Sequence, residues 1–123
     1  MIRWPLLLAA IFWVESRDGQ VTENTEGAIG PAQIHAGAVS DLNHRYGTSY
    51  AHSAFKNATL SRWAVIHYSR MYGAKTEEDV ARIWNAGPGG WEKGRGQDYW
   101  MKVRKRMKEL ENVEQQPATE ETD

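Results

Sequence analysis

An apolar run, PLLLAAIFWV over residues 5–14, ends directly before Glu15. A segment that is apolar on all sides is typical of a helix buried at the centre of a domain, and Pro5 suits a first helical turn. With Arg3 ahead of it, the run also superficially matches a secretory signal. It falls short of the roughly 20 residues that span a bilayer as a helix. We predict a central helix over residues 5–16.

The next part of the chain is polar and rich in turn residues. Residues 17–29 contain Gly, Asn, Asp and Thr with little apolar content, which predicts a loop or a small, mostly exposed β-hairpin. A second helix is predicted from near Pro31 to about Arg45, ending before Gly47.

Apolar residues in the second half recur at intervals of three and four, as in amphipathic helices. One helix is predicted over residues 58–72, with Gly73 as its stop. The next begins with Thr76 and Asp79 placed as a capping box and ends at Gly87. The helix over residues 58–72 has one face formed by Leu60, Trp63, Ala64, His67 and Met71. A last helix has an apolar stripe formed by Trp100, Val103, Met107 and Leu110, with basic residues around its other side.

This pattern predicts a mainly α fold of the α+β kind: one domain of about five helices over residues 1–110, with a small β-hairpin or loop after the first helix. The length of 123 residues fits one domain, and 41% hydrophobic residues with six Trp supply a core. Residues 111–123 are polar and acidic and are expected to be a disordered tail.

Charge is distributed unevenly along the chain. Residues 109–123 contain six acidic and no basic residues, so residues 1–108 carry a net charge of +5. A basic body favours an anionic partner such as nucleic acid, anionic lipid or wall polymer, although a solvated surface explains it equally well. For the basic run over residues 102–108 we favour a solvated helix face. The absence of cysteine excludes disulfides and thiolate chemistry.

Glu15 is the first candidate for chemistry. It follows a helix predicted to be buried, where desolvation and the negative end of the helix dipole both disfavour its charged form. A carboxyl group that stays protonated near neutral pH, at the edge of a cleft, is suited to act as a general acid on a departing sugar oxygen. The alternative from this stretch alone is that Glu15 marks where the helix reaches water.

Three short motifs occur in a recognisable order: Glu15-Ser16, then GAIGPAQI over residues 27–34, then ARIWNAGPGGW over residues 81–91. Together they resemble the lytic transglycosylase and goose-type lysozyme group. The later part, with YWMKV over residues 99–103, is also similar to invertebrate-type lysozymes. The resemblance covers about residues 6–105.

The resemblance implies a lysozyme-like fold in which the first helix is central and Glu15 is the catalytic acid. It also implies a set of substrate-binding residues, which match Ser16, Gly30, Gln33, Trp84, Asn85 and Gly87. Trp84 stands where the resembling groups have Tyr or His, so for this residue core packing and stacking on a sugar both remain open.

The second carboxylate is not settled by the sequence. Counting by the invertebrate-type pattern leads to Glu23, and Asp18 and Glu26 lie nearby. If Glu23 or Glu26 takes part, the reaction is hydrolysis; a transglycosylase needs Glu15 alone and forms 1,6-anhydromuramic acid ends. Hydrolysis is slightly favoured.

The sequence thus predicts a monomeric muramidase that cuts the β-1,4 bond between N-acetylmuramic acid and N-acetylglucosamine in peptidoglycan. The alternative of another class is a non-catalytic glycan-binding or virion structural module. We expect no cofactor, no nucleic acid and no stable membrane insertion, and no metal because the four His are scattered. Synthesis in the cytoplasm without a cleavable signal is expected, with delivery to the wall by a phage lysis system, a virion or a secretion machine.

Overall fold

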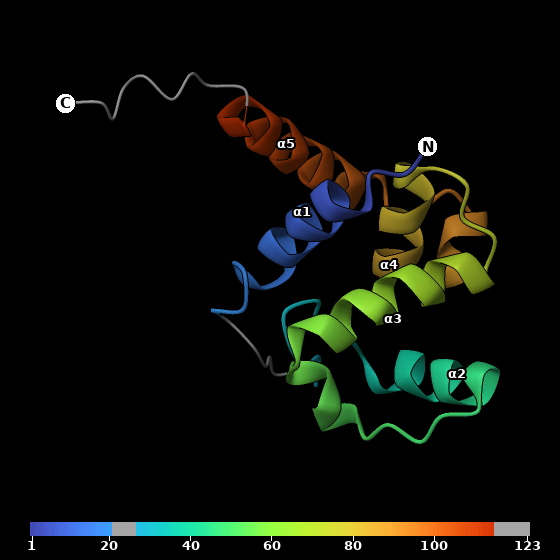
Figure 1. Ribbon diagram of the computed structural model, residues 1–123. Coiled ribbons are helices and arrows are strands. Elements are labelled where there is room, and N and C mark those ends of the chain that lie inside the picture. Colours follow the sequence, from blue (N-terminus) through green and yellow to red (C-terminus); the bar gives the residue numbers. More distant parts are fainter. Residues whose placement is uncertain (21–26, 115–123) are drawn as a thin grey trace.

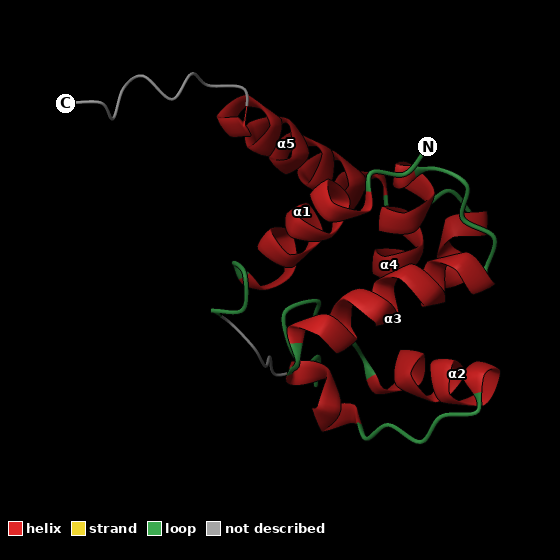
Figure 2. Cartoon of the chain, in the orientation of Figure 1, coloured by secondary structure: helices red, strands yellow, loops and turns green. Residues whose placement is uncertain are grey.

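The computed structural model describes residues 1–20 and 27–114, and this part of the chain is mainly helical (Figures 1 and 2). Its elements are α1 (Trp4–Ser16), α2 (Ala36–Tyr46), the 3-10 helix η1 (His52–Lys56), α3 (Ala58–Met71), α4 (Glu77–Glu92) and α5 (Gln97–Glu114). The predicted mainly α class is confirmed. The described residues contain no sheet, only an isolated antiparallel bridge between Ile29 and Ile34. The hairpin proposed within residues 17–29 depends on residues 21–26, which lie outside the described part.

Helix α1 packs against α5 (Figure 1). The guanidinium of Arg3, just before α1, pairs with Glu111 near the end of α5 and with Glu77 at the start of α4. Burial supports this placement, because Leu7 and Ile11 of α1 are fully buried. The apolar run therefore forms core, as its all-round hydrophobicity predicted. None of the helices in the described part is both long and apolar enough to cross a membrane.

Two apolar clusters make up the core. The first joins α1, α3, α4 and α5 and includes Val103, while the second joins α2, η1, α3 and α4 and includes Phe55. Trp84 of α4 is partly buried and packs against both clusters. The side chain of Trp84 therefore connects the two core clusters.

Local sequence signals explain most helix ends. Thr76 and Asp79 form the predicted capping box, with Asp79 N–H donating to the Thr76 hydroxyl at 3.0 Å. The helix was predicted to end at Gly87. Gly87 adopts φ 77° and ψ 164° and interrupts α4 there, but helical turns resume and α4 continues to Glu92. Helix α5 continues to Glu114, so residues 111–114 belong to a helix and not to the predicted tail; residues 115–123 lie outside the described part.

The second helix begins later than predicted, at Ala36 and not near Pro31. Backbone hydrogen bonds between Ile29 and Ile34, of 3.0 and 2.9 Å, close a tight turn in place of the first helical turns. Gly30 has φ +81° within this turn, and a Cβ there would lie 1.9 Å from the carbonyl oxygen of Phe55. Only glycine fits this approach, so the turn is built into the sequence.

Candidate functional site

Glu15 lies in the last turn of α1 and is partly buried. Burial raises the pKa of its carboxyl group from the ordinary value of 4.5 to about 7, because desolvation disfavours the charged form. The carboxyl group is therefore divided between its acid and anionic forms near neutral pH. This is the environment that the sequence predicted for Glu15.

Tyr99, in the first turn of α5, is a neighbour that changes the pKa of Glu15. Interaction with the Tyr99 hydroxyl lowers the pKa of Glu15, in opposition to the larger effect of burial. The Tyr99 hydroxyl is buried, and no group among the described residues meets the distance and angle of a hydrogen bond to it. Its interaction with the Glu15 carboxyl group is therefore weaker than a well-formed hydrogen bond. Sequence reasoning did not assign Tyr99 to the site. The signal was its place in the YWMKV motif, one residue before the apolar stripe of α5.

Ser16 connects the end of α1 to the turn over residues 30–34. Its hydroxyl donates to the Pro31 carbonyl at 2.7 Å, and it accepts a hydrogen bond from Gly19 N–H at 2.8 Å. The residue is only 2% exposed. The Ser16 hydroxyl is thus bonded to backbone groups and positions the turn, while substrate binding by Ser16 stays a prediction.

Trp84 fixes the same turn from the other side. Its indole Nε1–H donates to the carbonyl oxygen of Ala32 at 2.9 Å. The turn is thus bonded to α1 through Pro31 and to α4 through Ala32. These contacts set the position of Glu15, at the end of α1, relative to the surface of α4.

A cavity of about 230 Å³ opens beside this junction. It brings together four of the six residues predicted to bind substrate: Gln33, Trp84, Asn85 and Gly87. Its other lining residues are Ile34, His35, Ala38, Tyr68 and Ala86. The side chain of Asn85 is exposed, whereas Gln33 is buried and donates to the Gly30 carbonyl at 3.0 Å. The cavity therefore combines an aromatic surface with an accessible amide.

Tyr68 of α3 is a cavity residue that the sequence analysis missed. Its ring meets that of Trp84 edge to face, with centroids 5.7 Å apart and planes at 87°. Burial raises the pKa of Tyr68 to about 12, with smaller contributions from Tyr72 and Asp41, so its hydroxyl stays protonated. The three- and four-residue spacing placed the helix correctly, but it gave no sign that Tyr68 faces a cavity.

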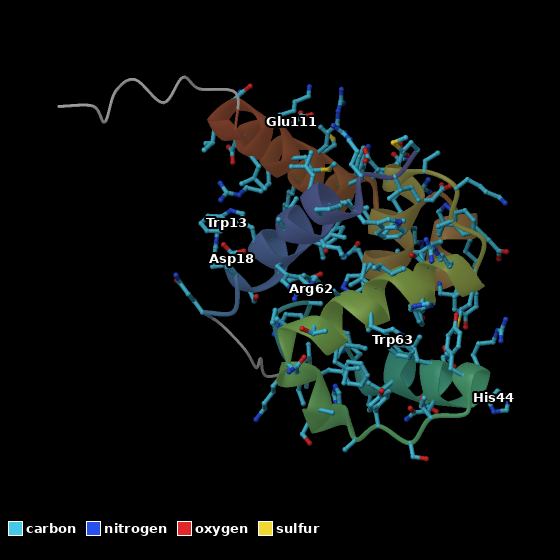
Figure 3. All side chains as sticks on the ribbon, in the orientation of Figure 1. Trp13, Asp18, His44, Arg62, Trp63 and Glu111 are labelled. Carbon is cyan, nitrogen blue, oxygen red and sulfur yellow. The ribbon has the colours of Figure 1, made fainter. Side chains whose placement is uncertain are left out.

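The remaining candidates from the sequence are Gly30, Glu23, Glu26 and Asp18. Gly30 is buried against Phe55 and has a structural role in the turn, while substrate binding at Gly30 stays a prediction. Glu23 and Glu26 lie outside the described residues. Asp18 is exposed just beyond the end of α1 (Figure 3). Within residues 1–20 and 27–114, no three His, Asp or Glu side chains gather in a way that would hold a metal ion.

The chain matches no protein-family model, and no curated protein or solved structure matches it either. The functional argument therefore depends on the environment of Glu15 and on the residues that line the cavity at Trp84.

Proposed function

We propose that this chain is a peptidoglycan-cleaving glycosidase with a lysozyme-like fold, in which Glu15 is the general acid. The observation that carries the proposal is the partly buried Glu15 carboxyl group, whose pKa is about 7 because of burial. An acid with a pKa near the working pH is both present in its protonated form and able to lose its proton.

The arrangement around Glu15 supports the same proposal. Ser16 bonds the end of α1 to the turn at Pro31, and the next residue of that turn is bonded to Trp84. A rigid connection of this kind keeps a catalytic acid at a fixed place relative to a substrate held at the cavity. The cavity of about 230 Å³ suits one sugar or one N-acetyl group of a longer glycan strand.

In the proposed reaction, a muramic acid residue is cleaved from the glucosamine that follows it. The protonated carboxyl group of Glu15 donates its proton to the glycosidic oxygen as the bond to the anomeric carbon breaks, so the glucosamine leaves as a neutral alcohol. Water then supplies the hydroxyl group at the anomeric carbon and returns a proton to Glu15. Asn85 has an exposed amide at the cavity edge, which is suited to bond an N-acetyl or hydroxyl group of the sugar.

The test is the release of soluble fragments from purified peptidoglycan by wild-type protein and by Glu15→Gln. The amide keeps the shape of the side chain but has no proton to donate, so we expect at least about 100-fold loss, the smallest effect typical of a general acid. Glu92→Gln is the matched control, because Glu92 is an exposed carboxylate at the end of α4 and should leave activity unchanged. Activity of Glu15→Gln within a few-fold of wild type, with an unchanged circular dichroism spectrum, would show that the chain is not this enzyme.

A further inference from the structure

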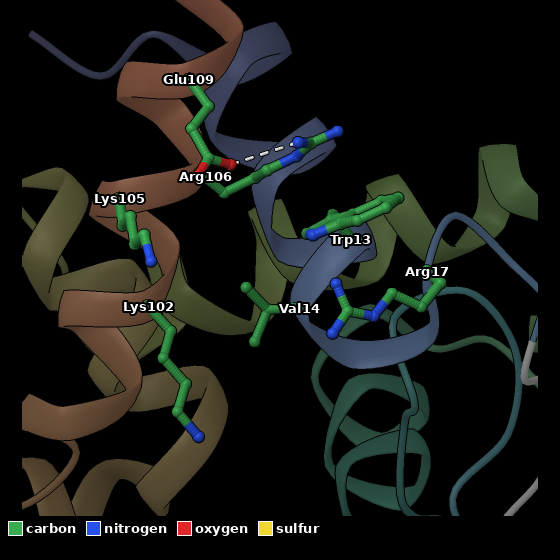
Figure 4. A pocket seen from close by; sticks show the side chains of 7 residues that line it. All are labelled: Trp13, Val14, Arg17, Lys102, Lys105, Arg106 and Glu109. Carbon is green, nitrogen blue, oxygen red and sulfur yellow. Dashed lines mark hydrogen bonds and ion pairs between the residues drawn. The ribbon is translucent and has the colours of Figure 1, made fainter.

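A second hollow, of about 470 Å³, lies between α1 and α5 (Figure 4). We call it the basic cleft. Its lining residues are Trp13, Val14, Arg17, Lys102, Lys105, Arg106 and Glu109. Four cationic side chains and one carboxylate give the lining a net charge of +3, so the cleft attracts anions.

Most of this charge is not neutralised by the protein. Arg106 pairs with Glu109 at 3.2 Å, whereas Arg17, Lys102 and Lys105 form no ion pair within the described residues. On a solvated helix face, cations spread outward into water. Here they converge on one hollow, and this mutual repulsion is relieved when an anion binds between them.

Trp13 holds the two arginines of the basic cleft. The Cζ atoms of Arg17 and Arg106 lie 4.7 and 4.0 Å from the centre of its ring, and Figure 4 shows one guanidinium on each side of the indole. This stacking orders both guanidinium groups before any ligand arrives. It also covers the faces of the indole, so the ring is not free to stack on a sugar or a nucleic acid base.

The positive charge continues along α5 beyond the cleft. A neighbouring hollow of about 340 Å³ is lined by Met101, Arg104, Lys105, Lys108, Glu109 and Asn112, and it shares Lys105 and Glu109 with the basic cleft. From Lys102 to Lys108 the helix rises by about 9 Å, at 1.5 Å per residue. Two adjoining basic hollows over this length suit a linear ligand with several anionic groups better than one small ion.

This cleft is separate from the proposed catalytic group. At about 100° per residue, Trp13, Val14 and Arg17 share one side of α1, and Glu15 is directed roughly 150° away from it. Occupation of the basic cleft therefore does not depend on the chemistry of Glu15.

We propose that the basic cleft binds a linear polymer of repeating phosphodiesters, such as a poly(polyol phosphate), through its phosphate groups. The guanidinium of Arg17, which has no ion pair within the described residues, pairs with phosphate oxygens in a forked geometry, and the lysines supply point charges to the neighbouring phosphates. A polymer without bases fits the cleft because the indole of Trp13 is already covered.

The experiment measures binding of poly(glycerol phosphate) chains of defined length by titration calorimetry, with inorganic phosphate as the single-ion comparison. We expect Lys102→Gln/Lys105→Gln to weaken polymer binding by about tenfold or more, and Arg17→Gln to weaken it as well. Lys75→Gln/Lys93→Gln is the matched control: it removes the same charge from exposed lysines outside the cleft and should change the dissociation constant less than about twofold. Inorganic phosphate should bind at least about 50-fold more weakly than the polymer, since it engages one group instead of several.

Several outcomes would overturn the proposal. Equal losses in the cleft and control variants would show attraction to net charge alone, and equal affinity for phosphate and polymer would show a site for one ion only. Equal binding of polyglutamate would remove the assignment to phosphate. Single-stranded DNA with the same number of phosphates, bound more than about tenfold tighter than the polymer, would identify a nucleic acid site in its place.

Discussion

The indole N–H of Trp84 and the hydroxyl of Ser16 hold consecutive carbonyl groups of one turn, those of Ala32 and Pro31, at 2.9 and 2.7 Å. One donor belongs to α4 and the other to α1. The turn is therefore a bridge between the helix that carries Glu15 and the helix that lines the cavity. Its position depends on both hydrogen bonds.

Trp84→Phe should separate the hydrogen bond of this bridge from its apolar contacts. Phenylalanine keeps an aromatic ring against both core clusters but leaves the Ala32 carbonyl without its donor, so we expect about 1–3 kcal/mol less free energy of unfolding. Urea denaturation measures this loss. Trp100→Phe is the control, because Trp100 is also partly buried but has no side-chain hydrogen bond in the described part. Equal losses in the two variants would mean that the indole N–H contributes nothing of its own.

Glu15 should make stability depend on pH in a direction opposite to that of most carboxylates. Its folded pKa of about 7 lies above the ordinary value of 4.5, so the folded state binds the proton more tightly. This contribution is complete below pH 4.5 and is lost as pH rises through 7. Because Glu15 is partly exposed, we expect a loss of about 2 kcal/mol and not the full value of the shift.

The comparison that isolates this effect is wild type against Glu15→Gln in urea at pH 4.5 and at pH 8. The variant lacks the titrating group, so the difference in unfolding free energy between the proteins should shift in favour of the variant at pH 8. A difference that is the same at both pH values would show that the Glu15 carboxyl group is not desolvated.

Tyr99→Phe should move the pH dependence of the proposed glycosidase activity. The Tyr99 hydroxyl lowers the pKa of Glu15, so its removal should raise that pKa and carry the alkaline limb of the activity profile to higher pH. Stability should change little, because the hydroxyl forms no full hydrogen bond among the described residues. An alkaline limb that stays in place, measured as kcat/KM against pH, would mean that Tyr99 does not change the pKa of Glu15, the proposed general acid.

Hydrophobic patterning predicted the approximate positions of the five α-helices but not the 3-10 helix η1. The first helix and the capping box at Thr76 follow from local preferences that the structure repeats, and the helix predicted to end at Gly87 is interrupted there but continues to Glu92. The start of the second helix was missed because a contact distant in sequence decides it. Gly30 must pack against the backbone of Phe55, and nothing near Gly30 in the sequence indicates that approach.

The site was predictable to the extent that its residues carry local motifs. Gln33, Trp84, Asn85 and Gly87, which were predicted to bind substrate, line one cavity. Ser16 and Gly30 share those motifs but are buried in the supporting structure, since a motif records which residues occur together and not which of them face solvent. Tyr68 and Tyr99 were missed because their proximity to the site arises from packing between helices.

The masses of the products should decide between hydrolysis and transglycosylation. Hydrolysis adds water across the glycosidic bond and leaves reducing muramic acid ends, whereas attack by the C6 hydroxyl of the same sugar leaves 1,6-anhydro ends that are lighter by one water. We expect reducing ends, because the GPAQI and YWMKV elements are more similar to the hydrolytic lysozymes and because Glu23 and Glu26 supply further carboxylates close in sequence to Glu15.

The same experiment should also be carried out with Glu23→Gln and Glu26→Gln, to test whether either carboxylate takes part in the reaction. If one of these carboxylates assists the attack of water, its amide variant should lose activity on peptidoglycan almost as fully as Glu15→Gln, because an amide can neither take up a proton nor stabilise the developing positive charge as a carboxylate does. Asp18→Asn extends the series to the exposed carboxylate beyond α1. Predominantly anhydro products, with all three variants active, would assign the reaction to a transglycosylase in which Glu15 acts first as acid and then as base.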